Sequence, residues 1–276
     1  MKNCAYLLFF LTTSLFISCS NTEVIVNKNV IEPSAPPVSG LFKQRVLIED
    51  YTGTWCGNCT RVSYAISQVL ENTDKAVPVA IHCDNDPFRF QNIQPLQQLI
   101  SPGGSLELPQ SRINRIVTWT FPEDLNIQEP VNYSGNNSGL GIALESSLSG
   151  NTVNLNVKAK FANNYSNLRL VVYLLEDHLF YNQVNYTSHY NSQNPVVNFE
   201  HNHVLRTSLT NLLGDAVTEN TSFGQTYTRN FSFTVPSNVA NASNIGFVAF
   251  IVGPDNKVLN VRGAHINENQ VFEQNP

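Results

Sequence analysis

Two cysteines separated by two residues, Cys56 and Cys59, are the side chains of this 276-residue chain best suited to chemistry. A Cys thiolate attacks disulfides, and two thiols at this spacing can close a disulfide and reopen it. A disulfide across so short a loop adds little stability through chain entropy, so stapling the fold is a weak explanation for the pair. The spacing therefore favours thiol–disulfide exchange, with an inert disulfide as the alternative.

A metal site is a further interpretation of the cysteine pair. Structural zinc takes four ligands, and Cys56, Cys59, His82 and Cys83 together supply that number. His82 and Cys83 are neighbours on a predicted strand, however, so their side chains point to opposite faces and converge poorly on one ion. We predict no metal and no cofactor other than the Cys56–Cys59 disulfide. Cys83 is expected to be a buried small residue, with a third redox thiol as the alternative.

The elements around the cysteine pair form a predicted βαβ unit. Residues 46–48 are an apolar run typical of a buried strand, and residues 52–54 break it. Apolar positions in residues 56–73 recur at helical spacing, and residues 75–83 form a second apolar strand. Cys56 is therefore expected at a helix N-terminus, where the partial positive charge lowers the pKa of a thiol.

The segment Trp55-Cys56-Gly57-Asn58-Cys59 resembles the W-C-G-x-C motif of the thioredoxin family. The resemblance also covers Asp50, which stands where thioredoxins keep a buried carboxylate. It implies that Cys56 attacks the substrate and that Cys59 resolves the mixed disulfide. It further implies that Asp50 accepts the proton beneath Cys59 and that Trp55 flanks the substrate groove.

Thioredoxins also carry a cis-proline opposite the disulfide, at the start of a later strand. Pro109 is the candidate for that position, and Pro102 is the second choice. Asn58 replaces the proline common in the thioredoxin motif, so the redox potential cannot be carried over. The thioredoxin-like domain is predicted to span residues 43–130, with an inserted helix and loop at 84–108 and no clear final helix.

The N-terminus resembles the export signal of a bacterial lipoprotein. Residues 5–17 form an apolar run too short to span a bilayer, and a small residue followed by Cys19 ends it. Residues 1–18 are predicted to be a signal peptide that is cleaved before Cys19, whose thiol is lipidated. Residues 19–42 are predicted to be the lipid anchor and a flexible tether. Ser20 favours sorting to the outer membrane; an ordinary signal peptide or an uncleaved anchor is the alternative.

The second half of the chain changes to the alternating pattern of strands. Its turn signals and alternation predict an antiparallel immunoglobulin-like β-sandwich over residues 138–276. A short helix is predicted at 209–213. His201 and His203 are expected on one face of a strand, pointing to solvent, with a metal pair as the alternative. The predicted strands cover residues 140–148, 153–161, 168–175, 196–205, 227–235, 245–252 and 258–261.

Several segments together resemble the twenty-eight-kilodalton outer-membrane lipoprotein family of Bacteroidetes. They are the block from Val46 to Cys59, the strand Ala80–His82, Asn114-Arg115, and the stretch from His201 to Arg206. The resemblance implies an outer-membrane lipoprotein, periplasmic or surface-facing, with a thioredoxin-like N-terminal part and a β-sandwich. The whole is an α+β chain of two domains.

Two functions are expected from these features. The first is a lipid-anchored thiol–disulfide oxidoreductase of the cell envelope, whose partners are exported protein thiols or disulfides. The second is a surface binding or adhesion lipoprotein in which the thioredoxin-like domain is a scaffold and the sandwich meets a surface partner. The net charge is −5 and no long basic run occurs, so nucleic acid is not an expected partner.

Overall fold

The computed structural model describes residues 41–135 and 137–274. The predicted signal peptide, Cys19 and most of the tether therefore lie outside the described residues. All described residues belong to one compact unit, in which strands predominate over helices, as an α+β chain requires.

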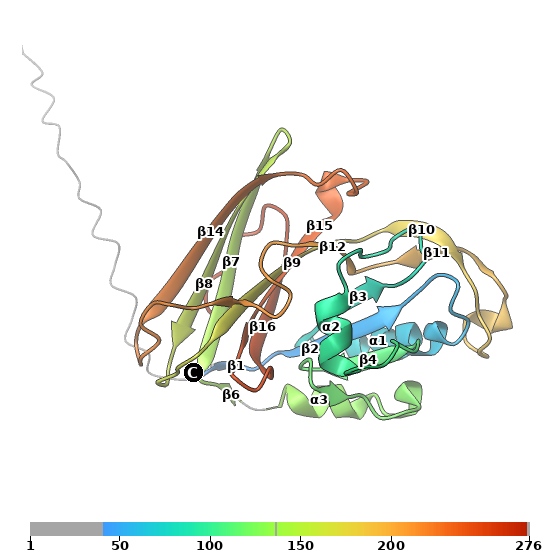
Figure 1. Cartoon of the computed structure of the whole chain (residues 1–276), viewed down its shortest axis with the longest axis horizontal. Helices are drawn as coiled ribbons and strands as arrows, with labels where there is room; N and C mark the ends of the chain where they lie inside the picture. Colours follow the sequence, from blue (N-terminus) through green and yellow to red (C-terminus); the bar gives the residue numbers. More distant parts are fainter. Residues whose placement is uncertain (1–40, 136, 275–276) are drawn as a thin grey trace, which may run out of the picture. The chain divides into compact units, whose positions relative to one another are not determined.

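The first part of the described chain builds a βαβ unit followed by an antiparallel pair. Figure 1 shows its α-helices gathered beside β2, β3 and β4. The predicted insertion contributes α2, and the short helix α3 closes this part. Its elements are β1 (Phe42–Lys43), β2 (Val46–Thr52), α1 (Cys59–Asn72), β3 (Ala76–His82), α2 (Gln94–Ile100), β4 (Gln110–Ile113), β5 (Val117–Thr118), η1 (Glu123–Leu125) and α3 (Gln128–Tyr133).

The second part is almost entirely strand. Five of the seven predicted strands agree with the structure to within one or two residues, while 196–205 divides into β11 and β12 and the last strand is longer than predicted. No helix occurs at 209–213, where a turn leads into β13 instead. The elements are β6 (Asn137–Ser138), β7 (Leu140–Ser149), β8 (Thr152–Phe161), β9 (Arg169–Glu176), β10 (Leu179–Gln183), η2 (Tyr190–Ser192), β11 (Val196–His201), β12 (Val204–Ser208), β13 (Asp215–Ala216), β14 (Thr226–Thr234), η3 (Ala242–Asn244), β15 (Ile245–Val252) and β16 (Val258–His265).

One sheet of nine strands runs through both parts of the described chain. Its order is β16-β15-β9-β12-β3-β2-β4-β5, with β13 paired beside β9. Strand β12 joins the two parts, because it pairs antiparallel with β9 and parallel with β3 at Val204 and Ala80. The predicted domain bounds stay predictions, since a shared sheet does not show where independently folding units end.

Three apolar clusters fill the layers of this structure. Helix α1 packs on one face of the sheet, where Val62, Ala65 and Val69 meet Val46 and Ile48. Alternate residues of β2 and β3 face the opposite side, together with α2 and residues of β9 and β15. The third cluster lies between the three-stranded sheet β14-β8-β7 and the part of the large sheet formed by β9, β15 and β16.

A two-stranded ribbon, β10 paired with β11, stands apart from the large sheet. Residues 184–195 connect its two strands. Although the ribbon belongs to the second part of the chain, it reaches the βαβ unit that carries the cysteines. The ribbon and the residues that connect its strands therefore supply many of the side chains described below.

Candidate functional site

Cys56 and Cys59 form a disulfide in the turn that leads into α1. Both cysteines are buried, and Cys56, at 6% exposure, is the more accessible of the two because Cys59 is at 0%. Helix α1 begins at Cys59 rather than at the predicted Cys56, because residues 57 and 58 form a turn. The turn is closed by hydrogen bonds from the Cys56 N–H to the Gly53 carbonyl and from the Cys59 N–H to the Cys56 carbonyl.

Asp50 lies on the sheet face that α1 covers. It follows Ile48 by two residues on β2, and Ile48 packs against α1, so alternation places the Asp50 side chain beneath the same helix. Its side chain is only 2% exposed, and no partner among the described residues hydrogen-bonds to Oδ1. Burial, and next the negative charge of Glu123, raise the pKa of Asp50 to about 8. Asp50 therefore holds a proton at neutral pH.

Glu123 connects the elements around Asp50. Its carboxylate accepts a hydrogen bond of 2.7 Å from Arg61 Nε on α1 and one of 3.3 Å from the Ser111 hydroxyl on β4. Ser111 pairs with Asp50 across β2 and β4. The ion pair with Arg61 keeps a charged group close to Asp50 without giving Asp50 a partner of its own.

Trp55 and Pro109 lie near the cysteines in different ways. The Trp55 side chain packs over Gly53 and is 45% exposed. The Leu108–Pro109 peptide bond is cis, whereas Pro102 is not among the cis prolines of the described residues. Pro109 directly precedes Gln110, which pairs with Tyr51, so it lies at the end of β2 from which the chain leads to Cys56.

The segment 183–189 lies against the cysteine turn, a feature that the sequence analysis missed. Backbone N–H groups of Val184 and Tyr186 donate to the carbonyls of Thr54 and Gly57, each over 2.8 Å. The Gln183 side-chain amide donates to the carbonyls of Gly53 and Cys56. The Tyr186 ring covers Gly57 so closely that any Cβ there would collide with it. No local motif in residues 183–189 predicts this long-range contact.

Asn185 fastens this segment to the start of α1. Its Oδ1 accepts hydrogen bonds from the hydroxyls of Thr60 and Thr187, over 2.8 and 2.7 Å, and its amide donates to the carbonyls of His189 and Gln193. Asn185 is 3% exposed. The sequence analysis passed over this residue because one Asn in an Asn-rich stretch carries no signal of burial.

Two further residues adjoin elements of the βαβ unit: His189, which lies against α1, and Cys83, which directly follows β3. His189 stacks on Tyr64 of α1, with 4.0 Å between ring centroids, and its Nε2 lies 2.9 Å from Asp124 Oδ2. Cys83 is buried, and its thiol donates to the Ile81 carbonyl. Burial is the main cause that raises the pKa of Cys83 to about 12. Its thiol therefore stays protonated and unreactive at neutral pH, as expected of a buried small residue.

His201 and His203 do not share a solvent-facing strand surface, which corrects the sequence expectation. Strand β11 ends at His201, and His203 takes a positive φ of 58° before β12 begins, so the alternation is interrupted between them. His201 is 6% exposed and lies among His82, Phe88 and Phe199, with ring centroids 4.8 to 5.3 Å away. Burial lowers its pKa to about 4.

A pocket of about 490 Å³ lies between α1, the ends of β2 and β3, and the ribbon. We name it the Asp50 pocket. Residues from α1 and the two strands form one side of it, and the stretch 196–203 forms the other. Its lining consists of Asp50, Thr52, Ser63, Ile66, Ser67, Leu70, Pro78, Ala80, His82, Gln183, Tyr190 and residues 196–203.

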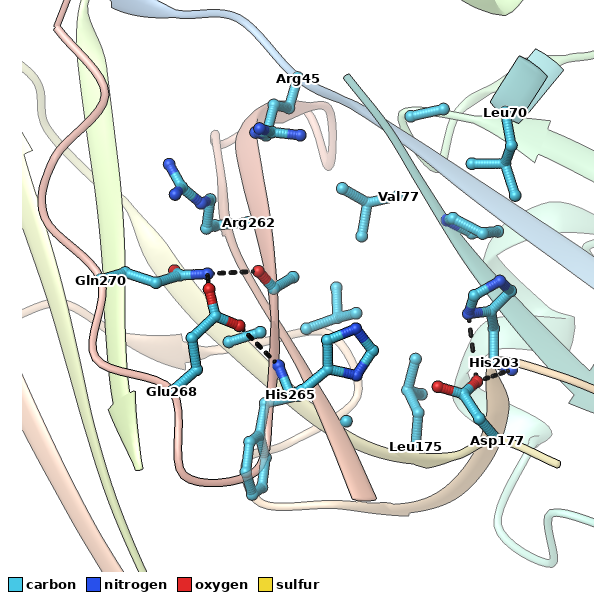
Figure 2. A pocket seen from close by; sticks show the side chains of 17 residues that line it. Arg45, Leu70, Val77, Leu175, Asp177, His203, Arg262, His265, Glu268 and Gln270 are labelled. Atoms are coloured by element: carbon cyan, nitrogen blue, oxygen red, sulfur yellow. Dashed lines mark hydrogen bonds and ion pairs between the residues drawn. The ribbon is translucent and has the colours of Figure 1, made fainter. Parts of the chain in front are cut away.

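A neighbouring pocket of about 340 Å³, shown in Figure 2, shares Leu70, Pro78 and His203 with the Asp50 pocket. His203 contacts Asp177 there, with Nδ1 3.3 Å from Oδ1. On the other side, the Gln270 amide donates to Glu268, whose carboxylate accepts from the His265 backbone N–H. These polar groups satisfy one another.

Within residues 41–135 and 137–274, no three His, Cys, Asp or Glu side chains gather to hold a metal ion. No helix of these ranges combines the length and apolarity that a membrane crossing requires.

Comparison with solved structures shows where the same fold occurs. HBP35 of Porphyromonas gingivalis has a TM-score of 0.62 and 16% identity, and the match covers 84% of this chain and 78% of that one. Protein AGR_C_4864 from Agrobacterium tumefaciens has a TM-score of 0.52 and 13% identity, covering 82% of this chain and 96% of that one. At these identities the likeness is one of fold.

A domain of the outer membrane lipoprotein Omp28 from P. gingivalis matches over 48% of this chain and its own full length, with 19% identity and a TM-score of 0.32. No curated protein matches the chain. The model of the family described as outer membrane protein Omp28 matches residues 97–270, which is 174 of the 276 residues. The chain therefore belongs to the Omp28 family of outer membrane proteins.

Proposed function

We propose that this outer membrane protein is a thiol–disulfide oxidoreductase whose active centre is the Cys56–Cys59 disulfide. The observation that carries the proposal is Asp50, a buried carboxyl beneath the helix that begins at Cys59, with its proton retained to about pH 8. A carboxyl placed in this way can exchange a proton with a buried thiol, and its Oδ1 has no hydrogen-bond partner among the described residues.

The fold around the disulfide supports a thioredoxin-like assignment for residues 43–130. It contains the βαβ unit, the antiparallel pair β4 and β5, and a proline with a cis peptide bond directly before β4. The short helix α3 follows at 128–133 and takes the place of the final helix that the sequence did not reveal. We assign the immunoglobulin-like sandwich to the facing sheets around β7, β8 and β14.

In the proposed reaction, Cys56 forms the mixed disulfide with the substrate and Cys59 is the thiolate that leaves. In the oxidised protein, a substrate thiolate attacks Cys56 Sγ, the Cys56–Cys59 bond breaks, and Cys59 leaves as a thiolate that takes the proton of Asp50. A second substrate thiolate then attacks the substrate sulfur bound to Cys56, so a substrate disulfide forms and Cys56 leaves as a thiolate. The substrate loses two electrons and the protein gains them; substrate reduction is the reverse sequence, in which ionised Asp50 takes the proton of Cys59.

A titration of the disulfide against glutathione tests this proposal. We expect a reversible two-electron couple within the range of exchange proteins, about −120 to −270 mV. The variant Cys59→Ser should trap mixed disulfides on Cys56, while the matched variant Cys56→Ser should trap none. A potential well below about −300 mV, or a disulfide that is reduced only on unfolding, would overturn the proposal.

A surface-binding lipoprotein is the second candidate function. It is favoured by exposed rings on and beside the ribbon, where Phe180, Tyr181 and Tyr186 are 54, 50 and 71% exposed. If the protein is a surface-binding lipoprotein, the double variant Cys56→Ser/Cys59→Ser should keep the protein's biological function. If it is an oxidoreductase, the same variant should lose that function. Lipidation of Cys19 is part of both proposals, and mass spectrometry of the mature N-terminus tests it.

A further inference from the structure

The Asp50 pocket contains two buried polar atoms that lack partners. Asp50 Oδ1 and His201 Nε2 have no hydrogen-bond partner among the described residues, and both side chains line the pocket. The two residues are 2% and 6% exposed. Buried polar atoms are nearly always hydrogen-bonded, so two open positions in one pocket indicate a place where a bound molecule completes the bonding.

The hydrogen-bonding character of the two atoms is defined by their protonation. Asp50, with a pKa of about 8, is a neutral acid at pH 7 that can both donate and accept. His201, with a pKa of about 4, is neutral at that pH. The Tyr181 backbone raises the pKa of His201, as a carbonyl that accepts from a ring N–H does, and since Nε2 has no partner among the described residues this N–H belongs to Nδ1. Nε2 is therefore the acceptor nitrogen of the ring.

The charges around the pocket disfavour an ionic ligand. The described lining contains no Lys or Arg. Of the remaining titratable groups, Glu200 contacts His178, His82 contacts Asp86 and His203 contacts Asp177. Burial is the main cause that raises the pKa of Tyr190 to about 12, so this phenol is neutral as well. An anion would lose its hydration here without gaining a cationic partner, and a cation would meet a protonated Asp50 and a Glu200 already paired with His178.

The other lining side chains are suited to an apolar ring. Ile66 and Leu70 come from α1, Val196 and Phe199 come from β11, and the Tyr190 ring lies 5.2 Å from Phe199. Thr52, Ser63 and Ser67 are hydroxyl-bearing residues of the same lining. A volume of about 490 Å³ is within the range of roughly 300 to 1,000 Å³ that small-molecule pockets occupy.

We infer that the Asp50 pocket binds an uncharged small organic molecule whose ring packs between α1 and β11 and whose hydroxyl or N–H group hydrogen-bonds to His201 and Asp50. This inference does not rest on the proposed redox function, because binding requires no electron transfer. It assigns His201 a recognition role that neither the cysteine motif nor the aromatic cluster explains.

Benzyl alcohol, benzoate and benzylamine are matched probes for this inference, since they share a ring and differ in charge. Each is titrated into the full chain in the oxidised state, and binding is followed by NMR chemical shifts. We expect benzyl alcohol to bind at least ten-fold more tightly than the two charged probes. The largest shifts should fall on residues 63–70 and 196–203.

Three variants locate the bound probe. His201→Phe removes the hydrogen-bond acceptor, and Ser63→Phe fills the pocket while leaving His201 in place. Each variant should weaken the binding of benzyl alcohol at least ten-fold. His265→Phe makes the same change as the first variant in the neighbouring pocket and should leave binding unchanged. The NMR spectrum of each variant reports whether it keeps the fold.

Three results would overturn the inference. They are the absence of benzyl alcohol binding to the unmodified chain, equal or tighter binding of a charged probe, and binding that the first two variants leave unaltered. A chain that binds benzyl alcohol but shows no reversible redox couple would refute the proposed function alone. A chain with the couple and without binding would refute the pocket alone.

Discussion

Glu49 and Asp50 are adjacent carboxyl side chains on β2, and they point to opposite faces of the same sheet. Both are buried, at 0 and 2% exposure. Glu49 Oε1 lies 3.2 Å from Arg115 Nη2, which also donates to the Tyr173 hydroxyl over 2.6 Å. Glu49 Oε2 and Asp50 Oδ1 both lack a hydrogen bond, but Asp50 has no arginine partner among the described residues. The comparison shows that a buried carboxylate beside an arginine contributes to the structure, while one without such a partner keeps its proton.

The paired face is the one that joins the two parts of the chain. Arg115 follows β4, whereas Tyr173 lies on β9 of the second part, and the guanidinium also lies 4.7 Å from the Phe250 ring centroid on β15. Glu176 and Arg206 form a similar buried pair, with Oε2 and Nε 3.3 Å apart. Asn114-Arg115 and the stretch ending at Arg206 therefore include residues that connect strands rather than residues beside the Cys56–Cys59 disulfide.

Removing the partner of Glu49 should have the largest effect on stability. Arg115→Met leaves a buried carboxylate uncompensated, which costs about 3–5 kcal/mol of unfolding free energy. Urea unfolding of the full chain measures the loss. Arg229→Met is the matched control, because its partner Asp215 lies at a more exposed site, and a loss below about 1 kcal/mol is expected.

The double variant Glu49→Leu/Arg115→Met sharpens this result. Replacing both members of a buried ion pair with apolar side chains should recover most of the stability lost in Arg115→Met. If the single variant were as stable as the unmodified chain, the contrast between the two faces of β2 would be wrong.

Asp50→Asn should act in the opposite direction. The pKa of Asp50 is raised in the folded chain, so between about pH 4 and pH 8 the unfolded chain releases this proton and the folded chain retains it. The unfolding free energy therefore falls as pH rises across that window. At pH 7 the variant should be more stable than the unmodified chain by about 2–4 kcal/mol.

Unfolding at pH 4 and pH 7 measures this gain, which should nearly vanish at the lower pH. Asp74→Asn is the control, since Asp74 is exposed and its pKa is lowered by hydrogen bonding to Lys43. That change should bring no gain at either pH. A destabilised Asp50→Asn chain at pH 7 would contradict the account of an unpaired, protonated carboxyl.

Loosening the segment at the cysteine turn should have a moderate effect. Asn185→Ala removes the buried side chain that accepts from Thr60 and Thr187, which costs about 1–3 kcal/mol. The turn becomes more accessible, so dithiothreitol should reduce the disulfide several-fold faster. Asn220→Ala changes an exposed Asn whose side chain accepts from the nearby Ser222 N–H, and it should alter neither quantity. Equal rates in the two variants would show that the segment does not shield Cys56.

Cys83→Ala should have the smallest effect. The thiol is buried and protonated, so the reduction potential of the Cys56–Cys59 pair should be unchanged, with about 1 kcal/mol lost through reduced packing. Glutathione titration and urea unfolding measure the two quantities. A shifted potential would assign Cys83 to the redox centre.

The parts that follow from local sequence were predicted well. The apolar run of β2, the helical spacing of α1 and the alternation in β7 and β8 each leave a periodic pattern that the structure reproduces. The cysteine spacing also placed the disulfide at a strand-to-helix turn. The start of α1 was wrong by one turn, because the residues between the cysteines form a turn of their own.

The long-range parts could not be predicted from periodicity. The pairing of β12 with β3 and the contact of 183–189 with the cysteine turn join residues more than 120 positions apart. His201 was expected at the surface because 196–205 was treated as a single strand. The positive φ of His203 breaks that strand, so that His201 is buried in the Asp50 pocket while His203 also lines the neighbouring pocket.

The central claim is that Asp50 supplies the proton to Cys59 when the disulfide opens. The rate of reduction by dithiothreitol, measured from pH 5 to pH 9 in the unmodified chain and in Asp50→Asn, tests it directly. Below pH 8 the unmodified chain should be reduced at least ten-fold faster than Asp50→Asn. The ratio of the two rates should fall toward one as Asp50 ionises above that pH. Equal rates, or a ratio that does not change with pH, would contradict the claim.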